Sequence, residues 1–137
     1  MGRIRQMINV RGRDSWTLFD SGARKTYITP AVAAMLTTAQ LESPVPTALG
    51  GAHKEAKQAA LLEAKIEGLP ISTHALVLDR IGLDEEGKQI EILFGALAMQ
   101  EWGIRLNPPD EKLDMTHYPT EFVEFGMETI LSSDEST

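Results

Sequence analysis

The sequence predicts a mostly β domain, built as a barrel or a sandwich. Short apolar or alternating segments recur along the chain, separated by turn residues such as Gly, Pro and Asp, a pattern typical of all-β folds. Helical patterns are short and occur only once or twice. At 137 residues the chain is the right length for one compact domain. We place that domain at residues 1–118 and expect an acidic C-terminal tail, partly disordered, at 119–137.

The first predicted strands lie on either side of one aspartate. Ile4–Val10 and Ser15–Asp20 flank the polar turn "RGRD", and the second of these segments runs through "TLF" into Asp20. The β-prone, mostly apolar residues of "TLF" favour a strand that ends at Asp20. Thr26–Thr29, "TYIT", is a further strand-like piece.

A short helix is predicted next, over "TPAVAAMLTTAQ" at residues 29–40. Thr29 stands at the N-cap position and Pro30 at the first helical position, which together are a helix start signal. "SPVP" at Ser43–Pro46 is expected to end the helix, because proline cannot donate the backbone hydrogen bond that a helix needs. The side chains expected to face the core are Val32, Met35 and Leu36.

The middle of the chain gives two conflicting signals. "AHKEAKQAALLEAKI" at Ala52–Ile66 is rich in Ala, Lys, Glu, Gln and Leu, so its local propensity is helical. Its apolar residues nevertheless alternate with charged ones from Leu62 to Ile66, which is the period of a half-buried strand. In the strand interpretation "EGLP" at Glu67–Pro70 is a hairpin turn. The residues alone leave both possibilities open.

The second half returns to short strands. Ile71–Asp79 contains a buried run, and "IGLDEEGKQ" after it is a turn-rich loop. Ile90–Phe94 is a predicted strand that bends at Gly95 into a short helix ending near Gly103. Two final strands are expected in "GIRLN" and "LDMTH", on either side of the turn "PPDEK".

Composition excludes several classes of function. The formal net charge is −7, which argues against nucleic acid as the main partner, because such proteins need a basic surface. The chain has no Cys, so disulfides, thiolate catalysis and Cys-based zinc sites are excluded. No apolar run approaches the roughly 20 residues of a membrane span, and the basic N-terminus lacks the apolar stretch of a secretory signal. We therefore expect a cytoplasmic protein without a membrane partner.

One motif imitates a phosphate-binding loop. Gly82–Gln89, "GLDEEGKQ", has the G-x-x-x-x-G-K spacing, but Gln89 stands where a Ser or Thr should bind Mg²⁺. Three acidic residues at 84–86 would repel a polyphosphate. The strand-like "IEILF" follows, so no helix N-terminus points at the anion. We interpret the segment as a surface loop.

No metal or cofactor site emerges either. The three histidines are far apart and lack metal-ligand spacing, and the chain has no G-x-S-x-G nucleophile motif. The histidines are His53, His74 and His117. We therefore expect neither a metal nor a cofactor.

Asp20 is the strongest candidate for a catalytic group. Taken alone, Asp-Ser-Gly is usually a turn in which the Asp side chain bonds its own backbone and Gly supplies a positive φ. Here, however, Asp20 closes an apolar strand, which places it at the base of a cleft. Ala23 is small and permits close packing beside it, and the next segment turns back into a strand.

"LFDSGA" at residues 18–23 resembles the active-site signature of the aspartic peptidases. "ILFGALAM" at Ile92–Met99 is similar to the apolar-apolar-Gly element of the single-domain, retropepsin-like branch, with Leu93, Phe94 and Gly95 as its core. "PTALGGAHKEA" fits the flap hairpin of that branch, with Gly50 and Gly51 near its tip. The resemblance covers about residues 4–117 and implies a closed, homodimeric retropepsin-like β-barrel. It also favours strands at Ala52–Ile66, against their local propensity.

The resemblance implies an aspartic endopeptidase. Such enzymes activate a water between two carboxyl groups, yet this chain has one signature, and Asp79 in "LVLDRIG" does not begin a second. A homodimer would bring two copies of Asp20 together on a two-fold axis. By resemblance, Ser21 would hydrogen-bond across the dyad, Gly22 would permit the tight turn beneath the water, and the Leu-Phe-Gly element would pack against each signature loop.

The same resemblance implies the substrate and its binding. An extended peptide or protein segment would bind by strand-like hydrogen bonds beneath a flap that bends at Gly50 and Gly51. Ser21 departs from the Thr of many relatives, which removes a methyl group from the dimer centre. The tail beyond the expected last strand is a second departure.

Two other interpretations stay open at this point. The chain can be a retropepsin-like binding or dimerisation module with little or no proteolytic activity, because a retained Asp does not require a productive dyad. It can also be an unrelated small β-barrel in which Asp-Ser-Gly is only a turn.

Overall fold

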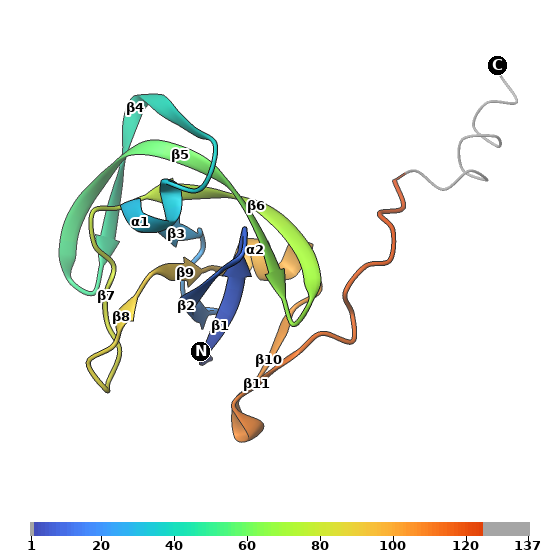
Figure 1. Cartoon of the computed structure of the whole chain (residues 1–137). Helices are drawn as coiled ribbons and strands as arrows, with labels where there is room; N and C mark the ends of the chain where they lie inside the picture. The colour runs from blue at the N-terminus through green and yellow to red at the C-terminus, as the bar shows by residue number, and fades with distance from the viewer. Residues whose placement is uncertain (1, 125–137) are drawn as a thin grey trace, which may run out of the picture.

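A computed structural model describes residues 2–124 and contains one large sheet and two short helices (Figure 1). The large sheet has seven strands in the order β1-β2-β9-β3-β6-β5-β4. One further pairing, Asn9 with Lys65, joins β1 to β5. The closed barrel and the homodimer stay predictions. The mostly β class predicted from the sequence is confirmed.

The centre of the sheet brings the Asp20 strand against a segment from the second half of the chain. β1 (Arg3–Val10) and β2 (Arg13–Asp20) form the predicted hairpin. β9 (Ile92–Phe94) pairs parallel with β2 and antiparallel with β3 (Tyr27–Ile28). Because β9 lies between β2 and β3, the loop that follows Asp20 has to cross the end of β9.

A long hairpin arches over this centre (Figure 1). It consists of β4 (Thr38–Leu49) and β5 (Ala52–Ile66), and β5 continues into β6 (Leu69–Val77) through a tight turn. The strand predicted at Ala52–Ile66 is confirmed. Its apolar residues from Leu62 to Ile66 are buried on one face, and β5 pairs with both β4 and β6. This pairing outweighs the helical propensity of the segment.

The helix predicted over residues 29–40 is too long. α1 spans only Pro30–Ala33, although it begins where expected. From Thr38 the chain is already strand β4, so "SPVP" at Ser43–Pro46 ends no helix and instead lies where the β4–β5 register shifts. The β-branched Thr37 and Thr38 are poor helix residues, and from Thr38 onward strand pairing with β5 is available. Val32 is buried, and Met35 and Leu36 pack partly buried against the core as predicted.

The single strand predicted at Ile90–Phe94 is divided. β7 (Gly82–Leu83) and β8 (Gln89–Ile90) form a small separate hairpin, and β9 begins at Ile92. At Glu91 between them, the backbone N–H donates to Trp16 O and the carbonyl accepts from Thr29 N. The chain therefore changes partners at Glu91. The segment with phosphate-loop spacing leads into strand β8 and not into a helix, as expected of a surface loop.

The remaining elements close the end of the domain. α2 (Ala96–Glu101) follows β9 directly, and β10 (Arg105–Asn107) pairs with β11 (Lys112–Asp114) across the short 3-10 turn η1 (Pro108–Asp110). The last strand is shorter than the predicted "LDMTH". The first residues of the predicted tail still contact the domain, since the Phe122 ring packs edge-on against Trp102 at 5.2 Å. Most of the tail, residues 125–137, lies outside the described residues, so the disorder expected there stays a prediction.

Two apolar clusters form the core. The larger contains Phe19, Phe94 and the buried face of α2. The smaller is centred on Tyr27, Leu76 and Leu93, and the hairpin residues Val45 and Leu49 pack against it. The smaller cluster therefore connects the arching hairpin to the strands beside Asp20. Among the described residues, no helix is long and apolar enough to cross a membrane.

Candidate active site

Asp20 is the only charged residue among the buried ones in residues 2–124, with 9% of its surface exposed. Its Oδ1 accepts a hydrogen bond from Gly22 N at 2.8 Å, and its Oδ2 lies 3.4 Å from Arg3 Nε. The backbone carbonyl of Asp20 accepts from Ala23 N at 3.1 Å. Carboxylates are seldom buried unless they are paired or functional. The turn predicted for Asp-Ser-Gly is present with its bond from backbone to the Asp side chain, and it holds a buried carboxyl at the end of a strand. The positive φ expected of its glycine is wrong, because Gly22 is not among the glycines with positive φ.

Ser21 is bound to the N-terminal segment of its own chain. Its Oγ accepts from Gly2 N at 2.8 Å, and Gly2 O accepts from Ser21 N at 3.0 Å. Together with the Arg3 ion pair, these bonds place Gly2 and Arg3 directly against the signature. Sequence reasoning missed both residues, because neither belongs to a motif. The hydrogen bond predicted for Ser21 across a dyad requires a second copy of the chain and stays a prediction.

The loop after the signature is fixed to the start of α2. Ala96 N donates to Ala23 O at 2.6 Å, and Leu97 N donates to Arg24 O at 3.1 Å. Gly95 N donates to the buried Thr26 Oγ1 at 3.1 Å. Thr26 is a further positioning residue that sequence reasoning missed, and its only signal was a hydroxyl at the start of a strand after the signature.

Gly95 has no room for a side chain. A Cβ atom at this position would lie 2.1 Å from Lys25 O and 2.8 Å from Arg24 O, far inside van der Waals contact. Only glycine therefore lets β9 and α2 approach the loop that follows Asp20. This close contact is compatible with the active-site support predicted for Gly95, and that role stays a prediction.

Leu93 and Phe94 lie beside the Asp20 strand. They pair in register with Leu18 and Phe19, and the rings of Phe19 and Phe94 are 5.0 Å apart. The two halves of the pattern recognised in the sequence, some seventy residues apart, are thus adjacent in the fold.

Gly50 and Gly51 form the turn at the tip of the arching hairpin. Their φ angles are +56° and +85°, which a two-residue turn between antiparallel strands requires and glycine adopts freely. Beneath the hairpin, Thr47 Oγ1 donates to the hydroxyl of Tyr27 at 3.4 Å. The hairpin therefore stands over β3, the first strand after the signature loop.

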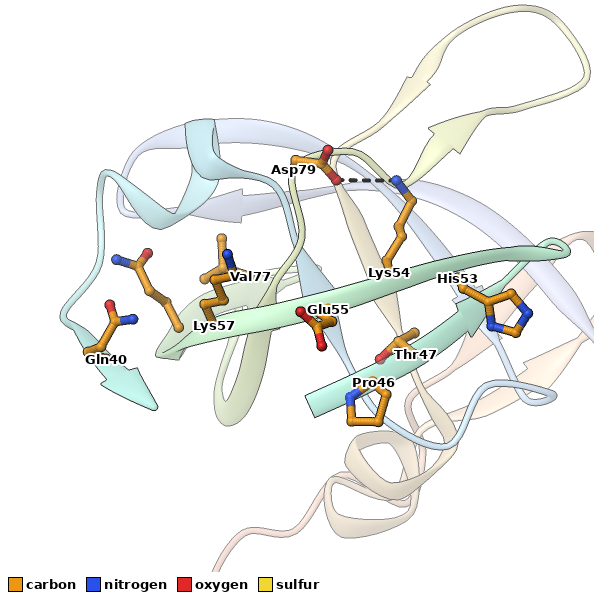
Figure 2. Close-up of a pocket in the computed structure, with 10 residues that line it drawn as sticks. Gln40, Pro46, Thr47, His53, Lys54, Glu55, Lys57, Val77 and Asp79 are labelled. Atoms are coloured by element: carbon orange, nitrogen blue, oxygen red, sulfur yellow. Dashed lines mark hydrogen bonds and ion pairs between the residues drawn. The ribbon is translucent and has the colours of Figure 1, made fainter. Parts of the chain in front are cut away.

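An open groove with a volume of about 890 Å³ lies along this hairpin (Figure 2). Lys54, Glu55, Lys57 and Asp79 give it a polar lining. Asp20 does not line it. Ser21 of the signature lines a different hollow of about 470 Å³, together with Gly2 and Ala96, so the groove along the hairpin and the signature are separate features of the single chain.

Asp79, considered above as a second catalytic acid, has a different role. Its carboxylate is exposed and lies 3.2 Å from Lys54 Nζ, as Figure 2 shows. The hydrogen bond and charge of Lys54 lower the pKa of Asp79 below its ordinary value of 3.8. The ion pair joins the hairpin to the segment after β6. Within residues 2–124 no three His, Cys, Asp or Glu side chains come together as metal ligands would.

We expect Lys54→Gln to raise the pKa of Asp79 toward its ordinary value. Because the folded-state pKa is lowered, the ion pair stabilises the fold above the unfolded pKa and is lost as pH falls through the folded value. An NMR titration of the carboxyl carbons measures the change. Asp114 is the matched control, because hydrogen bonds from Thr116 are the main cause of its lowered pKa. A shift at Asp114 as large as at Asp79 would mean that the ion pair is not the cause.

The strand order, the signature loop and its glycine support define a retropepsin-like protein. The model of the aspartyl protease family matches residues 7–97, which include the signature, the hairpin and the Leu-Phe-Gly element. The chain belongs to this family. This excludes the interpretation as an unrelated small β-barrel.

Solved structures support the same fold. The EIAV protease complexed with the inhibitor HBY-793 is 19% identical, with a TM-score of 0.56 over 77% of this chain and 93% of that chain. The retroviral protease-like domain of Ddi1 from Leishmania major is 10% identical, with a TM-score of 0.61 over 85% of this chain and 90% of that chain. No curated protein sequence matches this chain significantly.

Proposed function

We propose that this protein is an aspartic endopeptidase whose active site forms between two copies of the chain. The observation that carries the proposal is the buried Asp20 carboxyl at the end of β2, in a loop fixed by Gly95 and α2. Membership of the aspartyl protease family supports the reaction class. Since each chain has one signature, a two-fold axis is the simplest way to obtain two carboxyl groups.

The chemistry follows from two carboxyl groups in contact. They cannot both ionise cheaply, so one keeps a proton and the pair titrates with two separated apparent pKa values. The ionised Asp20 takes a proton from a water held between them, and the water attacks the peptide carbonyl. The protonated Asp20 of the other copy donates to the carbonyl oxygen. Gly22 N, which already donates to Oδ1, holds the carboxyl in position.

The substrate we propose is an extended peptide that lies between the signature loops and the arching hairpin. Such a peptide would add strand-like backbone hydrogen bonds to the hairpin, and the turn at Gly50 and Gly51 would let the tip bend over it. Val45, Leu49 and Ala23 pack partly buried around the smaller apolar cluster. They are suited to apolar side chains near the cut.

If the active site forms only in a dimer, the specific activity should depend on the enzyme concentration. At acidic pH we expect specific activity on a denatured protein substrate to rise with enzyme concentration, because only the dimer contains a complete site. The measurement combines mass spectrometry of the products with size-exclusion chromatography over the same concentrations. A folded dimer that cuts no peptide at any pH would contradict the proposed function, and an active strict monomer would contradict the shared site.

One observation favours a second candidate, a binding or dimerisation module without turnover. In the single chain Arg3 pairs with Asp20 and Gly2 bonds Ser21, so both polar groups of the signature are already occupied. A module of this kind would dimerise and bind peptides but leave them intact in the same experiment.

A further inference from the structure

Two cations that follow the signature have no acidic partner within residues 2–124. The first quarter of the chain has six basic side chains, of which four form ion pairs with carboxylates: Arg3, Arg5, Arg11 and Arg13. Arg24 and Lys25 are exposed, and within residues 2–124 neither side chain forms a salt bridge. Their charge is therefore available to another molecule.

The backbone beneath these side chains is held by contacts with Gly95 and α2. Arg24 O accepts from Leu97 N at 3.1 Å, and Lys25 O is packed against Gly95 so closely that no Cβ fits between them. Thr26, the next residue, is buried and bonded to Gly95 N. Because only the side chains need to be ordered on binding, a ligand that pairs with these cations loses little binding free energy to ordering.

Both cations follow Asp20 closely in the chain. Arg24 follows Asp20 by four residues, so their Cα atoms are at most about 14 Å apart. An extended peptide advances about 3.3 Å per residue. Its side chains within about four residues of the cut therefore lie in the range of Arg24 and Lys25.

We propose that Arg24 and Lys25 are specificity residues that select peptides with Asp or Glu within about four residues of the cut. This inference rests on the proposed function, since it describes the substrate of the same site. In a two-fold dimer both sides of the cut meet the same pair of cations. The net charge of −7 opposes general binding of acidic peptides to the surface as a whole.

The test measures binding separately from cleavage. The Asp20→Asn protein is mixed with two fluorescent peptide pools that have the same apolar centre but carry either Glu or Gln at the flanking positions. We expect the Glu pool to bind about tenfold more tightly at low salt, which is the effect of one or two charge-assisted hydrogen bonds. The difference should shrink in high salt. Equal binding of the two pools would overturn the proposal.

Charge-reversed variants identify the residues responsible. In the Asp20→Asn background, Arg24→Glu/Lys25→Glu should invert the preference, so that a third pool with Lys at the flanks binds best. Lys65→Glu/Lys112→Glu changes the net charge equally at two other exposed positions and should keep the preference for Glu. If both double variants lose the preference alike, the attraction is general and the proposal is wrong. If the reversed protein folds poorly, Arg24→Gln/Lys25→Gln replaces it and should abolish the preference.

Two further outcomes are distinguishable. In the first, Arg24→Glu/Lys25→Glu becomes monomeric while Arg24→Gln/Lys25→Gln keeps the preference for Glu. This result would mean that Arg24 and Lys25 contact the partner copy, and it would overturn the proposal. If the wild-type protein cleaves nothing, the proposed function fails while the binding result still decides the preference. If it cleaves peptides without favouring acidic flanks, only the specificity inference fails.

Discussion

Replacing Asp20 with Asn is expected to lower peptide cleavage by a factor of about 10²–10⁴, the range for removal of a general acid or base. Asn has nearly the shape of Asp and can still accept the hydrogen bond from Gly22 N, but it can neither take a proton from water nor donate a carboxylic proton. The rate of product formation, measured by mass spectrometry on a peptide that the wild type cuts, gives the factor. Circular dichroism and thermal melting provide the control that the variant is folded.

Mixing the two proteins tests whether Asp20 acts as a shared pair. If subunits exchange at random, an equimolar mixture contains about one quarter of fully wild-type dimers, and activity should fall to that fraction and not to one half. Tagged subunits separated after exchange allow the mixed dimer to be assayed alone. A mixed dimer with half of the wild-type activity would mean that each Asp20 works independently, and undiminished cleavage by folded Asp20→Asn protein would exclude the mechanism.

Much of the fold follows from local patterns of the sequence. The hairpin that ends at Asp20 was recognisable because β-prone apolar segments and turn residues are local signals, whereas the tip at Gly50 and Gly51 was placed by the family resemblance. The length of α1 was not recognisable. The signal that starts the helix at Pro30 is local, but the end of the helix depends on the pairing of Thr38 with Ala60 in β5. The strand at Ala52–Ile66 required the family resemblance, since its composition favours a helix.

Some residues of the candidate site could also be predicted from local sequence patterns, and others could not. Asp20 and Gly95 belong to short motifs and were found from the sequence. Thr26, Gly2 and Arg3 act through single contacts with residues that are distant in the chain, so no spacing rule could identify them. Arg24 and Lys25 were visible as charges, but their meaning depends on which other cations are paired. That pairing is a property of the fold.

Gly95→Ala is expected to be the most damaging change of one methyl group in the support of the site. The new Cβ would meet two backbone carbonyls, Lys25 O at 2.1 Å and Arg24 O at 2.8 Å, and backbone cannot rotate away as a side chain can. We expect the free energy of unfolding to fall by about 2–4 kcal/mol, as overpacking at a rigid contact does. The loop that carries Ala23 to Lys25 must also move, and a displacement of about 1 Å beside a reacting group costs about 10²-fold in rate.

Gly68→Ala is the control that separates the steric overlap at Gly95 from the loss of stability that replacing a glycine causes in general. Gly68 lies in the β5–β6 turn with φ +82° and nothing within 4 Å of a Cβ atom, so alanine there pays only about 1–2 kcal/mol for its left-handed backbone. Chemical denaturation of both variants gives the two free energies, and peptide cleavage by the folded fraction gives the two rates. We expect Gly68→Ala to leave cleavage unchanged, because the turn is not part of the signature loop or its support. Equal losses of stability and activity in the two variants would mean that the contact between Gly95 and the Lys25 carbonyl does not hold the signature in place.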